Sequence, residues 1–161
     1  MQNIEEHDVL SGSIDLFIVP SEEVAHVQPD NSLEHALLVL VKSGYTAIPV
    51  LNMSNELQGI ISKAQILDRI LGIERIEPEK LHSWLVEEIM EKDYTSVNYQ
   101  APFEKVMTQS IQYPFVCVED DEGSFKGIIP RSKILAHLNG FLHDLRKKMP
   151  PPEKKQHQTG R

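Results

Sequence analysis

The chain has 161 residues, 40% of them apolar, and a formal net charge of −8. It is long enough to bury a core as one compact body or as two closely packed halves, and its longest apolar runs fall far short of the roughly 20 residues that a membrane helix needs. Residues 144–161 carry a net charge of +4, which leaves −12 on residues 1–143, and a body this acidic repels phosphate polymers, so we expect no nucleic acid partner.

The first half of the chain predicts a short apolar lead-in followed by strand, helix, strand, strand and helix. Asn31 or Ser32 can cap the first helix, whose apolar residues recur at helical spacing, and Gly44 ends it. Residues 1–7 are acidic and lack the apolar core of a secretion signal, so we expect a cytoplasmic protein. The predicted elements lie at residues 14–18 (lead-in), 24–27, 33–43, 46–51, 57–61 and 62–71.

The second half predicts the same order of elements. The only cysteine, Cys117, lies in one of its strands, where we expect a small buried apolar side chain and neither a disulfide nor a reactive thiol. The last residues contain three consecutive prolines and show no apolar periodicity, which predicts a disordered tail that either solubilises the protein or docks to an acidic partner. The elements lie at residues 85–90 (lead-in), 96–98, 101–110, 113–118, 124–129 and 130–145.

The same order occurs twice because the sequence itself is repeated. Residues 59–67 recur as residues 127–135, at an offset of 68, whereas Val27 aligns with Val97 at an offset of 70. A period near seventy with only two copies predicts a tandem domain related by a pseudo-twofold axis, with clefts between the copies. The predicted fold class is α+β (mixed α/β), with two βαββα repeats. We place repeat 1 at residues 10–73, a linker at 74–84, repeat 2 at 85–145 and a disordered basic and proline-rich tail at 146–161.

The repeat resembles the CBS domain, which occurs in pairs (Bateman modules) that commonly bind adenosine nucleotides between the copies. The most specific marks are Ala-Ile-Pro-Val at residues 47–50, Gly-Ile-Ile at 59–61 and 127–129, and Val-Glu-Glu-Ile-Met at 86–90. Within that family the chain looks most like the small stand-alone CBS pairs of Gram-positive bacteria that bind cyclic di-AMP. The segments that carry this closer resemblance are residues 24–28, 33–40, 44–50 and 72–77.

The resemblance implies a second-messenger receptor that binds cyclic di-AMP in the cleft between the repeats and regulates a target protein by ligand-dependent association. In the resembling proteins the targets include the enzyme that makes and degrades guanosine alarmones. The second helix of each copy has an apolar face that a second chain would cover, so we expect a homodimer with one nucleotide site per chain. A sensor of AMP, ATP or another adenosine nucleotide and a ligand-free protein-interaction module remain as alternatives.

The candidate site combines a slot for a base with a positive position for a phosphate. Ala25 and Ala47 are small enough to leave room for a purine, Thr46 offers a hydroxyl, and the backbone near Ala47 offers a donor and an acceptor to the adenine edge. Arg131 and Ser132 begin a helix, where unpaired N–H groups favour a phosphate. The full predicted ligand-binding set is Val24, Ala25, Tyr45, Thr46, Ala47, Ile48, Ile129, Pro130, Arg131 and Ser132.

These residues also admit a purely structural role: the small ones could reflect tight packing, and Arg131 could pair with a carboxylate. CBS sites for AMP or ATP usually carry an aspartate three residues into this helix start, and Gln65 and Lys133 stand there instead, which disfavours those ligands. Conversely, the cyclic di-AMP-binding relatives tend to have a basic residue just before Val24, where this chain has Glu22 and Glu23.

Enzyme signatures are missing from the sequence. It contains no His-x-x-x-His pair, no glycine-rich phosphate loop and no Gly-x-Ser-x-Gly elbow. We therefore expect no catalysis, no metal and no cofactor, with a regulatory nucleotide as the only small-molecule ligand.

Overall fold

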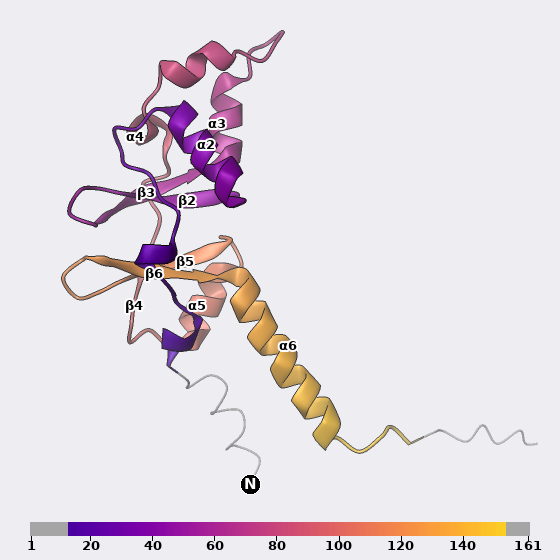
Figure 1. Cartoon of the computed structure of the whole chain (residues 1–161). Helices are drawn as coiled ribbons and strands as arrows, with labels where there is room; N and C mark the ends of the chain where they lie inside the picture. The colour runs from indigo at the N-terminus through magenta and orange to yellow at the C-terminus, as the bar shows by residue number, and fades with distance from the viewer. Residues whose placement is uncertain (1–12, 154–161) are drawn as a thin grey trace, which may run out of the picture.

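The computed structural model describes residues 13–153 (Figure 1). Residues 10–12 of the predicted first repeat and residues 154–161 of the predicted tail lie outside the described residues. The elements of the first half are η1 (Ile14–Phe17), β1 (Val19–Pro20), η2 (Ser21–Glu23), α2 (Leu33–Ser43), β2 (Ala47–Leu51), β3 (Leu57–Ser62) and α3 (Lys63–Ile70). Those that follow are η3 (Pro78–His82), α4 (Val86–Ile89), β4 (Val97–Asn98), α5 (Phe103–Ser110), β5 (Phe115–Glu119), β6 (Phe125–Pro130) and α6 (Arg131–Lys148).

Helix α2 forms where its capping signals predict it. The Ser32 hydroxyl accepts a hydrogen bond from the His35 N–H at 3.2 Å, and Gly44 ends the helix in the left-handed region with φ of 79°. Its apolar stripe is buried, which explains why the helix packs on the sheet through that face. The buried stripe consists of Leu33, Ala36 and Leu40.

Two segments differ from the sequence prediction. The strand expected at residues 24–27 is reduced to a single parallel bridge between Val27 and Val50, because the chain turns through η2 just before it. Helix α6 continues to Lys148 instead of ending near residue 145, so the first three residues assigned to the disordered tail are helical. The helix stops there because Pro150 disfavours helical geometry at Met149, which is extended.

The two lead-ins cross over between the repeats. The strands form one sheet in the order β1-β6-β5-β4 and a separate β2-β3 hairpin, with β4 parallel to β5 and the other pairs antiparallel. Strand β1 comes from the first half but pairs with β6 of the second, whereas Glu91 exchanges backbone hydrogen bonds of 2.9 and 3.0 Å with Ile60 of the first half. The residues that directly follow each lead-in therefore pair with a strand of the other repeat.

A repeated glycine permits both crossings. A Cβ at Gly59 would lie 2.5 Å from the carbonyl oxygen of Glu91, and a Cβ at Gly127 would lie 2.1 Å from that of Val19. Gly127 also has a φ of 151°, which side-chain-bearing residues rarely adopt. These two glycines occupy equivalent places in the repeat, at the offset of 68.

Three clusters of buried side chains hold the molecule together. One lies inside each repeat, and the third, which we call the shared core, lies between the two hairpins, which face each other in Figure 1 with most of the helices on their outer sides. Cys117 is fully buried, as expected for a small apolar side chain. The shared core consists of Val24, Ala47, Leu51, Ile60, Phe115, Cys117, Phe125 and Ile128.

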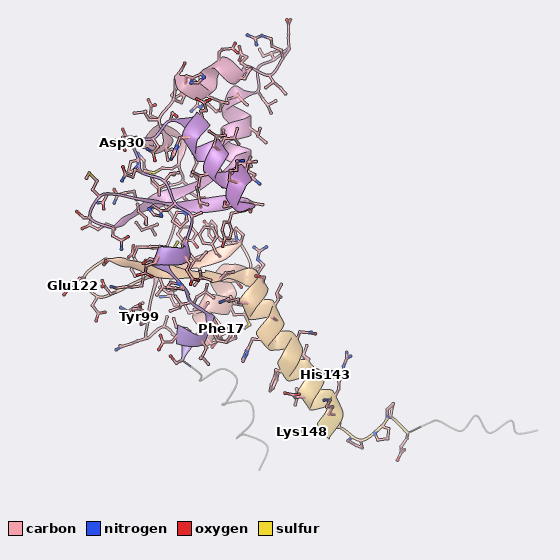
Figure 2. All side chains as sticks on the ribbon, viewed as in Figure 1. Phe17, Asp30, Tyr99, Glu122, His143 and Lys148 are labelled. Atoms are coloured by element: carbon pink, nitrogen blue, oxygen red, sulfur yellow. The ribbon has the colours of Figure 1, made fainter. Side chains whose placement is uncertain are left out.

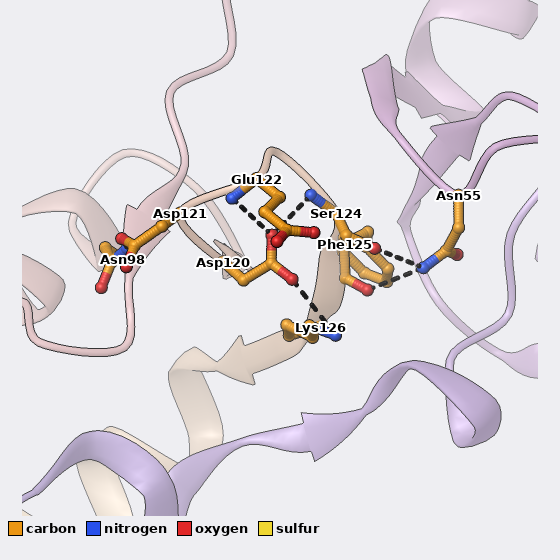
Figure 3. Close-up of polar contacts among 8 residues, drawn as sticks. All are labelled: Asn55, Asn98, Asp120, Asp121, Glu122, Ser124, Phe125 and Lys126. Carbon is orange, nitrogen blue, oxygen red and sulfur yellow. Dashed lines mark hydrogen bonds and ion pairs between the residues drawn. The ribbon is translucent and has the colours of Figure 1, made fainter.

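The tips of the two hairpins also meet (Figure 3). Asn55 donates a hydrogen bond of 2.8 Å from its side-chain amide to the Phe125 carbonyl. Asp120 accepts backbone hydrogen bonds from Ser124 and Glu122, which hold the pKa of its carboxyl group below the ordinary value. The Asp120 carboxylate thus stabilises the turn between β5 and β6.

Helix α6 extends away from the rest of the molecule (Figure 1), and Figure 2 shows His143 and Lys148 on its distal part. Among residues 13–153, no helix combines the length and the apolar character needed to cross a membrane.

Candidate nucleotide-binding site

The predicted base-binding residues lie at the junction between the repeats. Val24 and Ala47 belong to the shared core together with Ile128 of β6. Val24 directly follows η2, which contacts β6, and β6 leads into Arg131 and Ser132 at the start of α6. Residues from both repeats that the sequence grouped into one site therefore meet around β6.

Two of the predicted residues can contribute only through their backbone. Ile48 packs into the core of the first repeat and Ile129 into that of the second, and neither side chain is accessible. Val24 and Ala47 are also buried, with 5% and 7% relative exposure, in the shared core. The other six residues are more accessible to a ligand, because Thr46 and Ser132 are exposed and Ala25, Tyr45, Pro130 and Arg131 are half-buried.

The backbone of Ala47 points away from its hairpin partner. The Lys63 N–H donates to the Thr46 carbonyl at 2.9 Å, so the next opposing pair, Ala47 and Ser62, is a non-hydrogen-bonded pair of the antiparallel ladder. The N–H and C=O of Ala47 consequently face the other side of β2. This orientation suits a donor and an acceptor that read the edge of a base.

The Arg131 side chain is held by backbone carbonyls at the end of α5. Its Nε donates to the Ser110 carbonyl at 2.6 Å and its Nη2 to the Ile111 carbonyl at 3.4 Å, while its own N–H donates to Pro114 at 2.9 Å. Within the described part of the chain, Arg131 forms no ion pair with a carboxylate. The positive charge is therefore fixed beside the first turn of α6 while part of its five-donor fork stays available to a phosphate.

The starts of the two equivalent helices differ in their capping. Helix α3 begins with a capping box, in which the Ser62 hydroxyl accepts from the Gln65 N–H at 3.1 Å and the Gln65 side chain accepts from the Ser62 N–H at 2.9 Å. Helix α6 begins at Pro130, which provides no side-chain cap. The start of α6 thus keeps more of its N–H donors for an anion than the start of α3 does.

The charge near the base slot is unfavourable for an anion. Glu22 and Glu23 are both exposed in η2, directly before Val24. Among residues 13–153, no group of three or more His, Cys, Asp or Glu side chains is arranged to hold a metal ion that would offset this charge. Arg131 and the start of α6 supply positive charge at this junction.

Two residues at the equivalent positions of the second copy were not among the predicted site residues. Tyr94 stands where the first copy has Val24, at the offset of 70, and Phe115 stands where it has Ala47, at the offset of 68. The alignment of the two copies carries the signal, because both positions change from a small to a large side chain. The two clefts of the pseudo-twofold arrangement are consequently not equivalent.

Comparisons with known proteins agree with this architecture. The family model described as CBS domain matches residues 14–72 and 86–140. The chain is 44% identical over 147 residues to "Cyclic di-AMP receptor B" of Bacillus subtilis (strain 168), covering 91% of this chain and 100% of that protein. Among solved structures it is similar to a CBS domain-containing protein from Bacillus anthracis (46% identity, TM-score 0.79, covering 84% of this chain and 98% of that one). It is also similar to the CbpB protein of Listeria monocytogenes in complex with c-di-AMP (44% identity, TM-score 0.73, covering 78% of this chain and 94% of that one).

Proposed function

The chain belongs to the CBS-domain family, and from that premise we propose that it is a receptor for cyclic di-AMP. The observation that carries the proposal is that the small residues Val24 and Ala47 pack at one junction beside β6, which leads into the uncapped start of α6 at Arg131. The relatives named for this ligand, one of them solved with it bound, support the same assignment.

In this proposal one adenine lies against Val24, Ala25 and Ala47, and the Ala47 backbone reads its edge. Thr46 and Tyr45 border the slot. A phosphate rests at the first turn of α6, where it accepts hydrogen bonds from Arg131 and Ser132. We place one such site in each chain.

The residues at the helix starts favour a cyclic dinucleotide over AMP or ATP. Gln65 is engaged in the α3 capping box and Lys133 is exposed on α6, so neither copy offers a carboxylate to grip the two hydroxyls of a free ribose. A cyclic dinucleotide has its ribose 3′ oxygen tied up in a phosphodiester and requires less of that grip.

We further propose that the receptor is a homodimer through α6. Leu135 and Leu142 are 57% and 55% exposed, and they alternate with the half-buried Leu138 and Leu145 at spacings of three and four residues. This is the seam pattern that packs one helix against another. Covering it with a second copy would bury apolar surface that the protein otherwise leaves in water.

Such a receptor regulates a target protein through the surface that it presents. Ligand binding shifts that surface only if the two states of the protein differ in affinity for the ligand. By resemblance, we propose as the target class the enzyme that makes and degrades guanosine alarmones, with cytoplasmic location and no catalysis by the receptor itself.

Calorimetric titration tests the ligand directly. We expect micromolar or tighter binding of cyclic di-AMP and weaker or no binding of cyclic di-GMP, AMP and ATP. Tighter binding of ATP would contradict the proposal, and no heat with any of the four would leave a ligand-free interaction module.

Two substitutions test the site. Arg131→Gln should weaken cyclic di-AMP binding at least about tenfold, or about 1.4 kcal/mol, because it removes the positive charge beside the phosphate. Arg69→Gln is the matched control, since Arg69 stacks on Trp84 at 4.1 Å in the first repeat, away from α6. Ala47→Leu should abolish binding by filling the base slot, and unchanged binding would locate the slot elsewhere.

A further inference from the structure

The pseudo-twofold arrangement relates the proposed first cleft to an equivalent position, the second cleft, where Tyr94 and Phe115 stand in place of Val24 and Ala47. The shared core contains Val24 and Ala47 on the side of the first cleft and Phe115 on the side of the second, with Tyr94 packed against it. Exchanging the two copies therefore replaces two small residues with two aromatic ones.

The hydroxyl of Tyr94 bonds the backbone group that corresponds to the reader of the base in the first cleft. Phe115 faces Pro130 just as Ala47 faces Ser62, and the Arg131 N–H donates to the Pro114 carbonyl, so the Phe115 backbone also points away from its hairpin partner. The Tyr94 hydroxyl donates its hydrogen bond to that Phe115 carbonyl. In the first cleft, the equivalent carbonyl of Ala47 is the acceptor that we assign to the adenine amino group.

Aromatic packing fixes the Tyr94 ring in this position. Its centroid lies 4.7 Å from that of Tyr113 in an edge-to-face arrangement at 73° and 6.2 Å from that of Phe115. The Tyr113 hydroxyl in turn donates to the Glu91 carboxylate at 3.0 Å. Tyr113 and Phe115 thus hold the Tyr94 ring at the position that corresponds to Val24 of the first copy.

The phosphate end of the second cleft is occupied as well. The helix start that corresponds to Arg131 and Ser132 is that of α3, where the capping box between Ser62 and Gln65 uses the N–H groups that a phosphate would bind. In the second cleft, the carbonyl that would bind the base edge and the N–H groups that would bind a phosphate are therefore already hydrogen-bonded within the protein.

We propose that Tyr94 acts as an internal substitute for a base and thereby limits each chain to a single nucleotide. The inference rests on the proposed function, because it takes the first cleft as the one that binds. According to this inference, the residues at two positions of the repeat determine how many nucleotides one chain binds. These positions are Val24 with Tyr94 and Ala47 with Phe115.

Exchanging residues between the clefts tests this assignment. The variant Tyr94→Val with Phe115→Ala gives the second cleft the residues of the first, and the variant Val24→Tyr with Ala47→Phe does the reverse. We expect the wild type to bind one cyclic di-AMP per chain, the first variant to bind one adenosine more per chain than the wild type does, and the second variant to bind neither ligand. Calorimetry and equilibrium dialysis count the sites, and circular dichroism checks the fold of each variant.

Two results would overturn the inference: two cyclic di-AMP molecules per wild-type chain, or a folded Tyr94→Val, Phe115→Ala variant that binds no additional adenosine. If that variant does not fold, the wild type labelled with 3-fluorotyrosine decides. The fluorine NMR resonance of Tyr94 is identified by its loss in Tyr94→Phe. We expect it not to shift when adenosine is added beyond the first equivalent per chain. A shift would mean that adenosine displaces the ring and would overturn the inference.

The same measurements separate this inference from the proposed ligand. If the wild type does not bind cyclic di-AMP, the proposed function is contradicted. An additional adenosine site in the Tyr94→Val, Phe115→Ala variant would still support the inference about the second cleft. Two cyclic di-AMP molecules per chain would uphold the ligand and overturn the inference.

Discussion

At the scale of single residues, burial gives Tyr94 and Cys117 a measurable effect on stability. Burial raises the pKa of the Tyr94 hydroxyl and that of the Cys117 thiol. In the unfolded state tyrosine ionises at about pH 10 and cysteine at about pH 8.5. Above these pH values the unfolded state therefore releases protons that the folded state keeps. The free energy of unfolding is therefore unaffected by these two groups below about pH 8.5 and decreases as the pH rises further. We expect the urea midpoint to fall between about pH 8 and about pH 10.5, and Tyr94→Phe to lessen that fall. A midpoint independent of pH over this range would contradict the assignment.

Also at the residue scale, the two glutamates of η2 should limit affinity. Glu23→Lys is expected to strengthen cyclic di-AMP binding a few-fold, on the order of 0.5–1 kcal/mol for an exposed charge change near a phosphate. The effect should shrink at high salt, because screening weakens exposed charges. Glu74→Lys makes the same charge change in the exposed linker and should leave the titration unchanged. Equal gains from both variants would indicate a general charge effect.

At the scale of elements, two glycines have opposite effects on stability: one lies inside a helix and the other lies where two strands approach closely. Gly140 lies inside α6 with no atom within 4 Å of an added Cβ, so Gly140→Ala should raise the free energy of unfolding by about 0.5–1 kcal/mol. Gly127→Ala should lower it by about 2 kcal/mol or more, because its Cβ would strike the Val19 carbonyl and its φ is unsuited to alanine. Urea denaturation measures both, and a neutral Gly127→Ala would mean that β1 does not cross to β6 as described.

The elements that the sequence predicted well are those with local signals. Ser32 and Gly44 mark the ends of α2, and the turns at residues 52–56 and 120–123 mark the hairpins, so these follow from neighbouring residues. The crossing of β1 and of Glu91 to the other repeat has no local signal, because it depends on contacts between residues far apart in the sequence. Ala47 and Arg131 were predicted as site residues from side-chain size, from charge and from their places in the repeat, and these predictions stay untested. The role that we propose for Tyr94 was not predicted, because its signal appears only when side-chain sizes are compared at equivalent positions of the two copies.

At the scale of the whole molecule, the exposed seam of α6 predicts the oligomeric state. Leu142→Glu should convert the proposed homodimer into a monomer, because it places a charge in the middle of the seam. Light scattering coupled to gel filtration measures the mass. Met53→Glu is the control, since Met53 is 93% exposed in a hairpin turn and the same change there should leave the dimer intact. A monomeric wild type would contradict the prediction.

The crossing of β1 and of Glu91 between the repeats has a consequence for any attempt to dissect the protein. A fragment that contains only the first repeat would include β1, whose partner β6 lies in the second repeat. It would also lack Glu91 and so expose the unpaired edge of β3. Expressed alone, either half should therefore aggregate, whereas both halves produced together should reassemble by exchanging their lead-ins. We therefore expect the complete pair to be the smallest unit that folds on its own.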